Sequence, residues 1–177
     1  KNLEMLARMV PKLTRVAVLT NPDNSSHATI LKSMQAAIRK SAMQILPVEA
    51  RTPQEIEGAF LRMARENAAA VLVAADQVFQ QQWRQIAELA AKHRLPSITR
   101  FREYPEAGGL MSYGSNLADS YRRAATYVDK IFKGAKPADL PVEQPMIFEL
   151  FINGKTAKAL GLKIPQSLLI MATKIIE

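Results

Sequence analysis

The sequence of 177 residues contains no cysteine and only two histidines, and aromatic residues make up 6% of it. The absence of cysteine excludes disulfides, thiolate metal ligands and cysteine nucleophiles. His27 and His93 are the only imidazole donors and do not form a pair at helical spacing, so we expect no metal and no cofactor. No apolar run approaches the roughly 20 residues of a membrane-spanning helix.

Positive charge is in excess, because 24 Lys and Arg face 16 Asp and Glu and give a formal net charge of +8. Such an excess is one feature of nucleic-acid-binding proteins. Here the basic residues are scattered over loops and the polar sides of expected helices, and they form no continuous run. Few aromatic residues accompany them as stacking platforms, so we expect no nucleic-acid partner.

Apolar segments alternate with helical patterns along the first hundred residues. We expect strands at 15–20, 44–49, 69–75 and 96–100, and helices at 1–10, 24–41, 53–66 and 78–93. The stretch Thr52-Pro53-Gln54-Glu55 combines an N-cap, a first-turn proline and a capping-box glutamate. This alternation predicts an α/β fold in three layers, a parallel sheet flanked by helices, as in a flavodoxin-like lobe.

The pattern changes after residue 105. A strand at 109–113 leads to a strongly amphipathic helix, which Asn116 caps and Gly134 ends, and then to a proline-bearing connector. A strand at 147–152, a short helix closed by Gly161 and a final helix near 166–175 complete the chain. We expect residues 1–104 and 142–177 to form one lobe, and residues 105–141 to pack with another.

Ligands of open parallel sheets bind at the carboxyl ends of the strands, near the point where the strand order reverses. This rule selects the loops at 20–26, 75–78 and 99–104. The first belongs to the stretch "VAVLTNPDNSSHATIL", whose small polar residues either cap the next helix or help its backbone N–H groups to hold an anion. Asp76 likewise either caps a helix or contacts a ligand.

Enzymatic motifs are incomplete. Asn153-Gly154-Lys155-Thr156 is similar to the end of a P-loop, but Glu149 replaces the glycine that would let the backbone wrap a phosphate, so we expect Asn153 to be an N-cap. Asp76 occupies the position of a phosphorelay acceptor, yet Thr20 and Asn21 replace the acidic pair that binds magnesium.

A catalytic triad is also incomplete. Ser25, Ser26 and His27 follow Asp23, but neighbouring residues project in different directions, so we expect these residues to cap a helix. Trp83 shares a helical face with Phe79 and Ile86 and is expected in the core. We expect no enzymatic activity.

Four stretches then carry a resemblance: "RVAVLTNPDNSS", "AAVLVAADQVF", "EAGGLMSYGSNLADSYRRAATYVDKIFKGAKPADLPVEQP" and "FELFINGKTAKALGL". Together they cover most of the chain, and the block from Glu106 to Pro145 is the most specific. In this order they resemble the solute-binding proteins of bacterial ABC importers, in the tryptophan/tyrosine-type family with the type I periplasmic binding fold.

The resemblance implies a two-lobed protein that closes over an amino acid or similar small solute and presents it to a membrane permease. Such a protein is periplasmic, or lipid-anchored outside the membrane. Family members carry a whole first lobe and an export signal ahead of the equivalent of Lys1, so we expect this chain to correspond to the carboxyl-terminal portion.

Strand-end geometry and the resemblance together predict the residues that contact the solute. They are Thr20, Asn21, Ser25, Ser26, Asp76, Gln77, Phe79, Arg100, Arg102, Tyr113, Ser115 and Asn116. Asp76 would receive an ammonium group, and Arg100 and Arg102 would bind a carboxylate. The last three would stand at the crossing to the other lobe.

Two other functions stay open at this point. The chain fits the effector-binding core of a transcription repressor, which shares the two-lobed fold, or an enzyme on a flavodoxin-like sheet. A helix-turn-helix upstream would favour the repressor, and an export signal would favour the importer. The helix at 116–133, if it lacks partners from the other lobe, would expose an apolar stripe or bury it against a second copy of the chain.

Overall fold

The computed structural model describes residues 1–39 and 41–177. Within them, the strands are β1 (Arg15–Thr20), β2 (Gln44–Glu49), β3 (Ala70–Val73), β4 (Ser97–Thr99), β5 (Met111–Ser115), β6 (Phe148–Asn153) and β7 (Lys174–Ile176). The helices are α1 (Asn2–Met9), α2 (Ser26–Ala37), α3 (Pro53–Arg65), α4 (Gln77–Gln81), α5 (Trp83–Lys92), α6 (Glu103–Glu106), α7 (Leu117–Phe132), α8 (Gly154–Ala159) and α9 (Gln166–Met171), with a 3-10 turn at Pro137–Asp139.

The strands form one sheet in the order β2-β1-β3-β4-β5-β6-β7. The first five are parallel to one another, β6 runs antiparallel to β5, and β7 runs parallel to β6. Strand order reverses between β1 and β3, the switch point at which doubly wound sheets place their ligands. The predicted parallel α/β architecture is confirmed.

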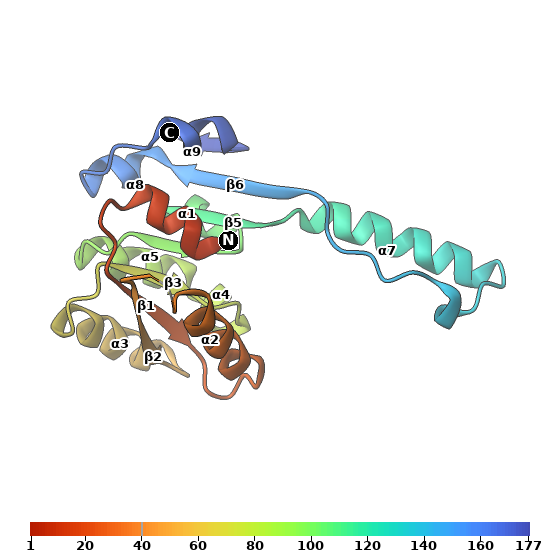
Figure 1. Ribbon diagram of the computed structural model, residues 1–177, viewed down its shortest axis with the longest axis horizontal. Helices are drawn as coiled ribbons and strands as arrows, with labels where there is room; N and C mark the ends of the chain where they lie inside the picture. The colour runs from red at the N-terminus through yellow and green to blue at the C-terminus, as the bar shows by residue number, and fades with distance from the viewer. Residues whose placement is uncertain (40) are drawn as a thin grey trace.

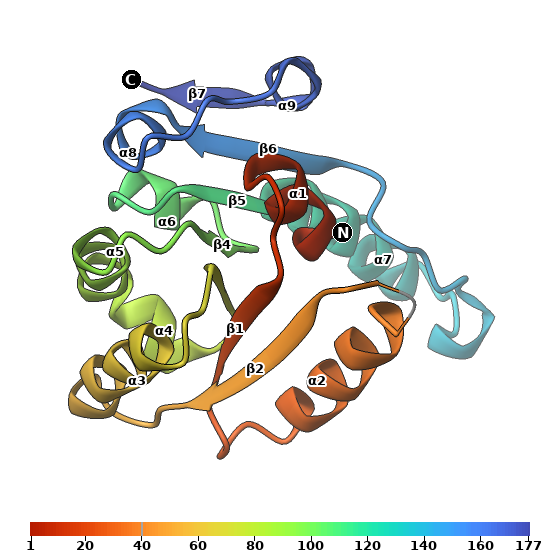
Figure 2. The same cartoon turned by 60° about the vertical axis from the view of Figure 1, so that its left-hand side comes forward.

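Two separate clusters of buried side chains show the three layers. Ala17 and Leu19 of β1 pack on one face with α3, α4, α5 and α6, whereas Val16 and Val18 pack on the other with α1, α2, α8 and α9. Figure 2 shows α3, α4 and α5 on one side of the sheet and α1 and α2 on the other. Since β1 and β3 are buried on both faces, they lack the polar alternation of a half-exposed strand.

Local signals set most element boundaries. The Thr52 hydroxyl accepts a hydrogen bond from the Glu55 N–H (3.2 Å), as the capping box predicts, and α3 begins at Pro53. Strands β1 and β2 have the predicted bounds. Helix α2 starts later than predicted and ends at Ala37, and Lys40, which the predicted helix included, lies outside the described residues.

Two helical predictions were wrong in part. The helix expected over 78–93 is divided at Gln82, because its N–H bonds to the Phe79 carbonyl (3.0 Å) in a tightened turn before α5 begins. The final helix stops at Met171 instead of continuing to 175, because Lys174 and Ile175 pair with β6 and extend the sheet. Pairing across the sheet overrides local helical spacing here.

Helix α7 and the following segment 133–147 form an arm, residues 117–147, which projects from the carboxyl edge of the sheet (Figure 1). None of the residues in α7 is buried, and the helix displays a stripe of exposed apolar side chains: Leu117, Tyr121, Val128, Ile131 and Phe132. The returning segment is held along α7 by an ion pair between Arg123 and Glu143 and by the Tyr127 hydroxyl, which donates to the Pro141 carbonyl (2.7 Å).

The first part of the segment 105–141, which is expected to pack with another lobe, lies in the sheet in this structure. Strand β5 pairs with β4 and β6, and Tyr104 and Pro105 of α6 are buried in the body. Strand β5 and these two residues therefore belong to the body of the structure, and the arm begins after Ser115, the last residue of β5. Among the described residues, no helix has both the length and the apolar character needed to cross a bilayer.

In the turn before β5, the backbone of Gly109 lies directly against the ring of Tyr104. A Cβ atom at this position would lie 2.1 Å from the Tyr104 ring. Tyr104 is fully buried, its hydroxyl donates to Ser97 Oγ (2.7 Å), and its ring meets the edge of Trp83 (5.3 Å between centroids). Burial raises the pKa of the Tyr104 hydroxyl above its ordinary value of 10, because the charged form would lose its hydration.

We predict that Gly109→Ala lowers the free energy of unfolding by about 1–3 kcal/mol, because the added methyl group overpacks this aromatic cluster. The matched control is Gly58→Ala in α3, where a Cβ meets nothing within 4 Å, and it should raise that free energy by about 0.5–1 kcal/mol. Urea unfolding of both variants measures the difference, and equal stability of the two would contradict the packing described.

Candidate functional site

The loops that follow β1 and β3 are joined at the switch point through the carboxylate of Asp76. Asn21 donates from Nδ2 to Asp76 Oδ1 (3.2 Å), and Asn24 donates from Nδ2 to Oδ2 (3.0 Å). The Val78 N–H also donates to Oδ1 (2.9 Å), so Asp76 is the N-cap of α4. The capping role considered for Asp76 is confirmed, and the same carboxylate fixes the loop after β1.

His27 makes a second link between these loops. Its ring is 2% exposed, with Nδ1 2.9 Å from the Asn21 N and Nε2 3.1 Å from the Ala75 carbonyl oxygen. A neutral ring that carries its proton on Nε2 satisfies both contacts, and this tautomer is assigned from the hydrogen-bond partners. Since both nitrogens meet backbone atoms, His27 is a structural cross-link between the two loops.

The predicted capping by the serines was wrong in detail. Ser25 is the N-cap residue of α2, but its side chain makes no capping hydrogen bond. Asn24 supplies the acceptor instead, because its Oδ1 receives the Ser26 N–H (3.2 Å) and the Ser26 hydroxyl (2.7 Å). An Asx turn thus leaves Ser25 and Ser26 exposed at the sheet edge.

The environment of Asp76 favours its charged form. Burial of Asp76, which is 7% exposed, raises the pKa of its carboxyl, but hydrogen bonds from Asn24, Asn21 and Val78 lower the pKa more. The result is a pKa below the ordinary value of 3.8. Asp76 is therefore ionised near neutral pH, with three donors directed at it.

Of the other residues predicted at this edge, some are buried beneath the loops and one is exposed. Thr20 is 2% exposed, and its hydroxyl donates to the Val48 carbonyl (3.4 Å). Phe79 has no exposed surface and packs in the core beneath α4, whereas Gln77 is exposed. Of the predicted residues on this part of the edge, Ser25, Ser26 and Gln77 are therefore the exposed ones.

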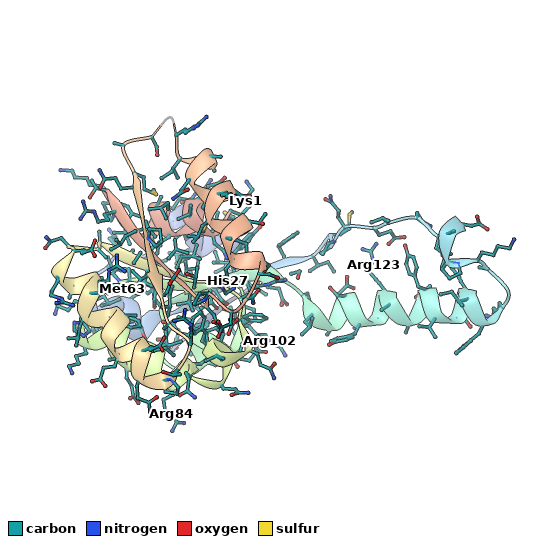
Figure 3. The ribbon with its side chains drawn as sticks, turned by 90° about the horizontal axis from the view of Figure 1, so that it is seen from below. Lys1, His27, Met63, Arg84, Arg102 and Arg123 are labelled. Carbon is teal, nitrogen blue, oxygen red and sulfur yellow. The ribbon has the colours of Figure 1, made fainter. Side chains whose placement is uncertain are left out.

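A pocket of about 260 Å³ lies at the same sheet edge, at the base of the arm. Its lining includes the predicted Arg100, Arg102 and Ser115, and also Glu149, Tyr121 and Phe151. Figure 3 shows Arg102 on the side of the body from which the arm leaves, with Arg123 farther out along the arm and His27 inside the body.

Gly114 allows β5 to pass close to the backbone of Arg100. A Cβ at Gly114 would lie 2.0 Å from the Arg100 carbonyl oxygen. Any residue with a side chain here would clash with this oxygen and displace the loop after β4. The absence of a side chain at Gly114 therefore lets the backbone of Arg100 lie against β5.

The three residues predicted at the crossing to the other lobe lie in different surroundings. Ser115 lines the pocket, whereas Tyr113 packs with the cluster on the opposite face of the sheet and stacks on Phe148 (5.7 Å between centroids). Asn116 accepts the Asp119 N–H (2.8 Å) as the N-cap of α7 and donates from Nδ2 to Glu149 Oε1 (2.8 Å). Asn116 thus connects the arm to β6.

Sequence reasoning missed Glu149 as a site residue and considered it only as an obstacle to a phosphate loop. Glu149 lies opposite Gly114 in the antiparallel pair of β5 and β6, a pairing that local patterns did not predict. Asn153 caps α8 by accepting the Thr156 N–H (2.9 Å), as expected. No group of three or more His, Asp or Glu within the described part of the chain is placed to hold a metal ion.

Comparison with known proteins identifies the family. The model of the ABC transporter substrate binding protein family matches residues 1–176. The chain belongs to this family. Comparison with curated protein sequences gives no match.

Solved structures with the same fold are similar along nearly the whole chain. A conserved domain protein from Vibrio cholerae is 21% identical, with a TM-score of 0.88 over 98% of this chain and 58% of its own length. An ABC domain in complex with L-Trp from Streptococcus pneumoniae is 23% identical, with a TM-score of 0.88 over 99% of this chain and 59% of its own.

The ligand-free, open structure of CD0873, a substrate binding protein with adhesive properties from Clostridium difficile, is 19% identical, with a TM-score of 0.79. It is matched over 100% of this chain and 59% of its own length. The chain thus spans less than two thirds of the length of these structures.

We predict that Asp76→Asn lowers the free energy of unfolding at neutral pH by about 1–3 kcal/mol. The NH2 group of the asparagine would replace one carboxylate oxygen and would face an N–H donor in place of an acceptor. The folded pKa of Asp76 is depressed, so its contribution is present above the unfolded value of about 3.9 and disappears as the pH falls through the lower folded value. The stability difference should therefore shrink below about pH 4.

Chemical unfolding of both proteins across this range of pH measures the effect. Asp139→Asn on the exposed arm is the matched control and should leave stability unchanged at every pH. A constant difference between wild type and Asp76→Asn down to strong acid would contradict the proposed role of the ionised carboxylate.

Proposed function

We propose that this chain is part of an extracytoplasmic solute-binding protein of an ABC importer, and that it binds an amino acid or similar small solute without catalysing a reaction. The observation that carries the proposal is the placement of the loops after β1, β3 and β4 and the base of the arm along one edge of the sheet. Membership of the substrate-binding family supports it. In this proposal the partner is a membrane permease.

The binding surface proposed is the carboxyl edge of the sheet, closed from the other side by a second lobe. Ser25, Ser26 and Gln77 present polar groups on one part of it, and Arg100, Arg102 and Ser115 line the pocket on the other. Thr20, Asn21, Asp76 and Phe79 hold the loops in place, Asn116 connects the arm to β6, and Tyr113 packs on the opposite face of the sheet. The family assignment favours this function over a repressor core or a flavodoxin-like enzyme.

The arm supports the two-lobed arrangement. A groove of about 460 Å³ runs between α7 and the segment that returns from it, and the apolar side chains of the α7 stripe keep between 39% and 86% of their surface exposed. We propose that residues 117–147 pack with the second lobe, while the remainder of the chain forms the other lobe. Continuous apolar surface of this kind is a common mark of an interface.

The experiment that tests the function is a thermal-shift screen of the full-length protein with the twenty L-amino acids. A solute at a hundred times its dissociation constant stabilises the folded state by about 2.7 kcal/mol. We therefore expect at least one amino acid to raise the melting temperature by several degrees, and L-tryptophan, the ligand of the similar Streptococcus pneumoniae structure, is the first probe. No shift with any of them would overturn the proposed solute class.

The 177-residue chain alone should bind the same amino acid only weakly. A micromolar solute is held by about 8 kcal/mol, so a lobe that provides half of the contacts retains roughly 4 kcal/mol and a millimolar dissociation constant. Isothermal titration calorimetry of this chain checks the expectation. A submicromolar dissociation constant would show that the site is complete without a second lobe.

We also propose that this chain forms a homodimer through α7 when no second lobe covers the stripe. The paired change Tyr121→Ser and Val128→Ser should shift the chain to monomer in sedimentation velocity at millimolar concentration, because both side chains are exposed on the stripe. The control is Leu61→Ser, which removes an equally exposed apolar side chain outside the arm and should leave the dimer. A wild-type chain that stays monomeric would rule out this dimer.

A further inference from the structure

Opposite charges from separate elements face the pocket at the base of the arm. Arg100 follows β4, and Glu149 is the second residue of β6. Neither forms an ion pair with any residue that the structure describes, whereas Arg102, on the same pocket, pairs with Glu103 (3.6 Å). A half-buried carboxylate and a guanidinium thus share one cavity without neutralising each other.

The carboxylate of Glu149 has unused hydrogen-bonding capacity. In the described part of the chain, its one hydrogen bond comes from Asn116 Nδ2 to Oε1 (2.8 Å), although an ionised carboxylate offers about four acceptor positions. Asp76 differs, since its two oxygens already accept from Asn21, Asn24 and Val78. Of these two carboxylates, Glu149 is the one with capacity for a further donor.

The remaining walls of the pocket suit an apolar side chain. Leu117 and Tyr121 of α7 and Phe151 of β6 contribute to the lining, and Arg100 lies over the ring of Phe101 (5.5 Å). A ligand with a positive and a negative group and an apolar substituent complements all of these surfaces. An α-amino acid with an apolar or aromatic side chain has this composition.

We propose that Glu149 determines the specificity of the site by accepting hydrogen bonds from the α-ammonium group of an amino-acid-like solute, whose carboxylate pairs with Arg100. This inference rests on the proposed function, and it assigns the ammonium group to Glu149 instead of Asp76. Asn116 orients the carboxylate of Glu149, and through its N-cap it ties this group to the start of the arm. Charge-assisted hydrogen bonds of this kind are the strong ones in proteins.

The test uses the full-length protein and the variant Glu149→Gln, which removes the charge but keeps an oxygen that accepts from Asn116. The probes are L-tryptophan and its des-amino analogue, in which hydrogen replaces the ammonium group, with L-tyrosine and its des-amino analogue as a second pair. Calorimetry gives the dissociation constant of each. The matched control is Glu57→Gln, an exposed glutamate of α3.

We expect the wild type and Glu57→Gln to prefer the amino acids over the des-amino analogues. Glu149→Gln should weaken the amino acids by about tenfold or more, and change the analogues by less than about twofold, so that the preference is lost. Glu149→Asp keeps the charge and should retain the preference. Glu149→Ala, which also removes the carboxylate, provides the comparison if Glu149→Gln does not fold.

The outcomes separate this assignment from the function on which it rests. Amino-acid binding that Glu149→Gln leaves unchanged, or an equal loss for amino acids and analogues, would overturn the assignment of Glu149 and leave the solute-binding function intact. Loss of the preference in Glu149→Asp would also overturn it, because the charge is retained there. A wild type that binds none of the amino acids would overturn both.

Discussion

The parallel pairing of β1 with β3 within the sheet is the constraint on which the rest of the structure depends. Both strands are buried on both faces, so helices must cover each side and the chain must cross over between strands. Their carboxyl ends consequently lie side by side, and the loops after them meet at the switch point. The candidate site follows from this arrangement, because the polar side chains of both loops are brought together at the switch point.

The sheet edge divides its polar residues between two tasks. Asp76 and His27 direct their polar atoms at backbone and side-chain groups of the two loops, and both are nearly buried. Such fully partnered groups give the edge a fixed shape at little cost, since each buried polar atom has a hydrogen-bond partner. Arg100 and Glu149, in contrast, keep their charges toward a cavity beside the arm. A binding site needs both features: loops held in place by partnered groups, and charged groups beside them that are available to a ligand.

Sequence reasoning predicted the parts of the fold that local interactions decide. The bounds of β1 and β2, the cap at Thr52 and the cap at Asn116 follow from residues within four positions of each other. It failed where distant segments pair: β5 joins β4 and β6, and β7 replaces the end of a helix. Glu149 was missed for the same reason, because its hydrogen-bond partner Asn116 lies 33 positions away in the sequence.

The central claim is that a solute binds at the carboxyl edge of this sheet, and hydrogen exchange of the full-length protein with and without a bound amino acid tests it most directly. The account predicts slower amide exchange on binding at residues 21–27, 75–78 and 100–103 and at the start of α7, with little change in the last turn of α3, which ends beside Arg15 at the opposite edge of the sheet. Protection confined to other surfaces, such as α3 or the strand β7, with unchanged exchange in these loops, would contradict it.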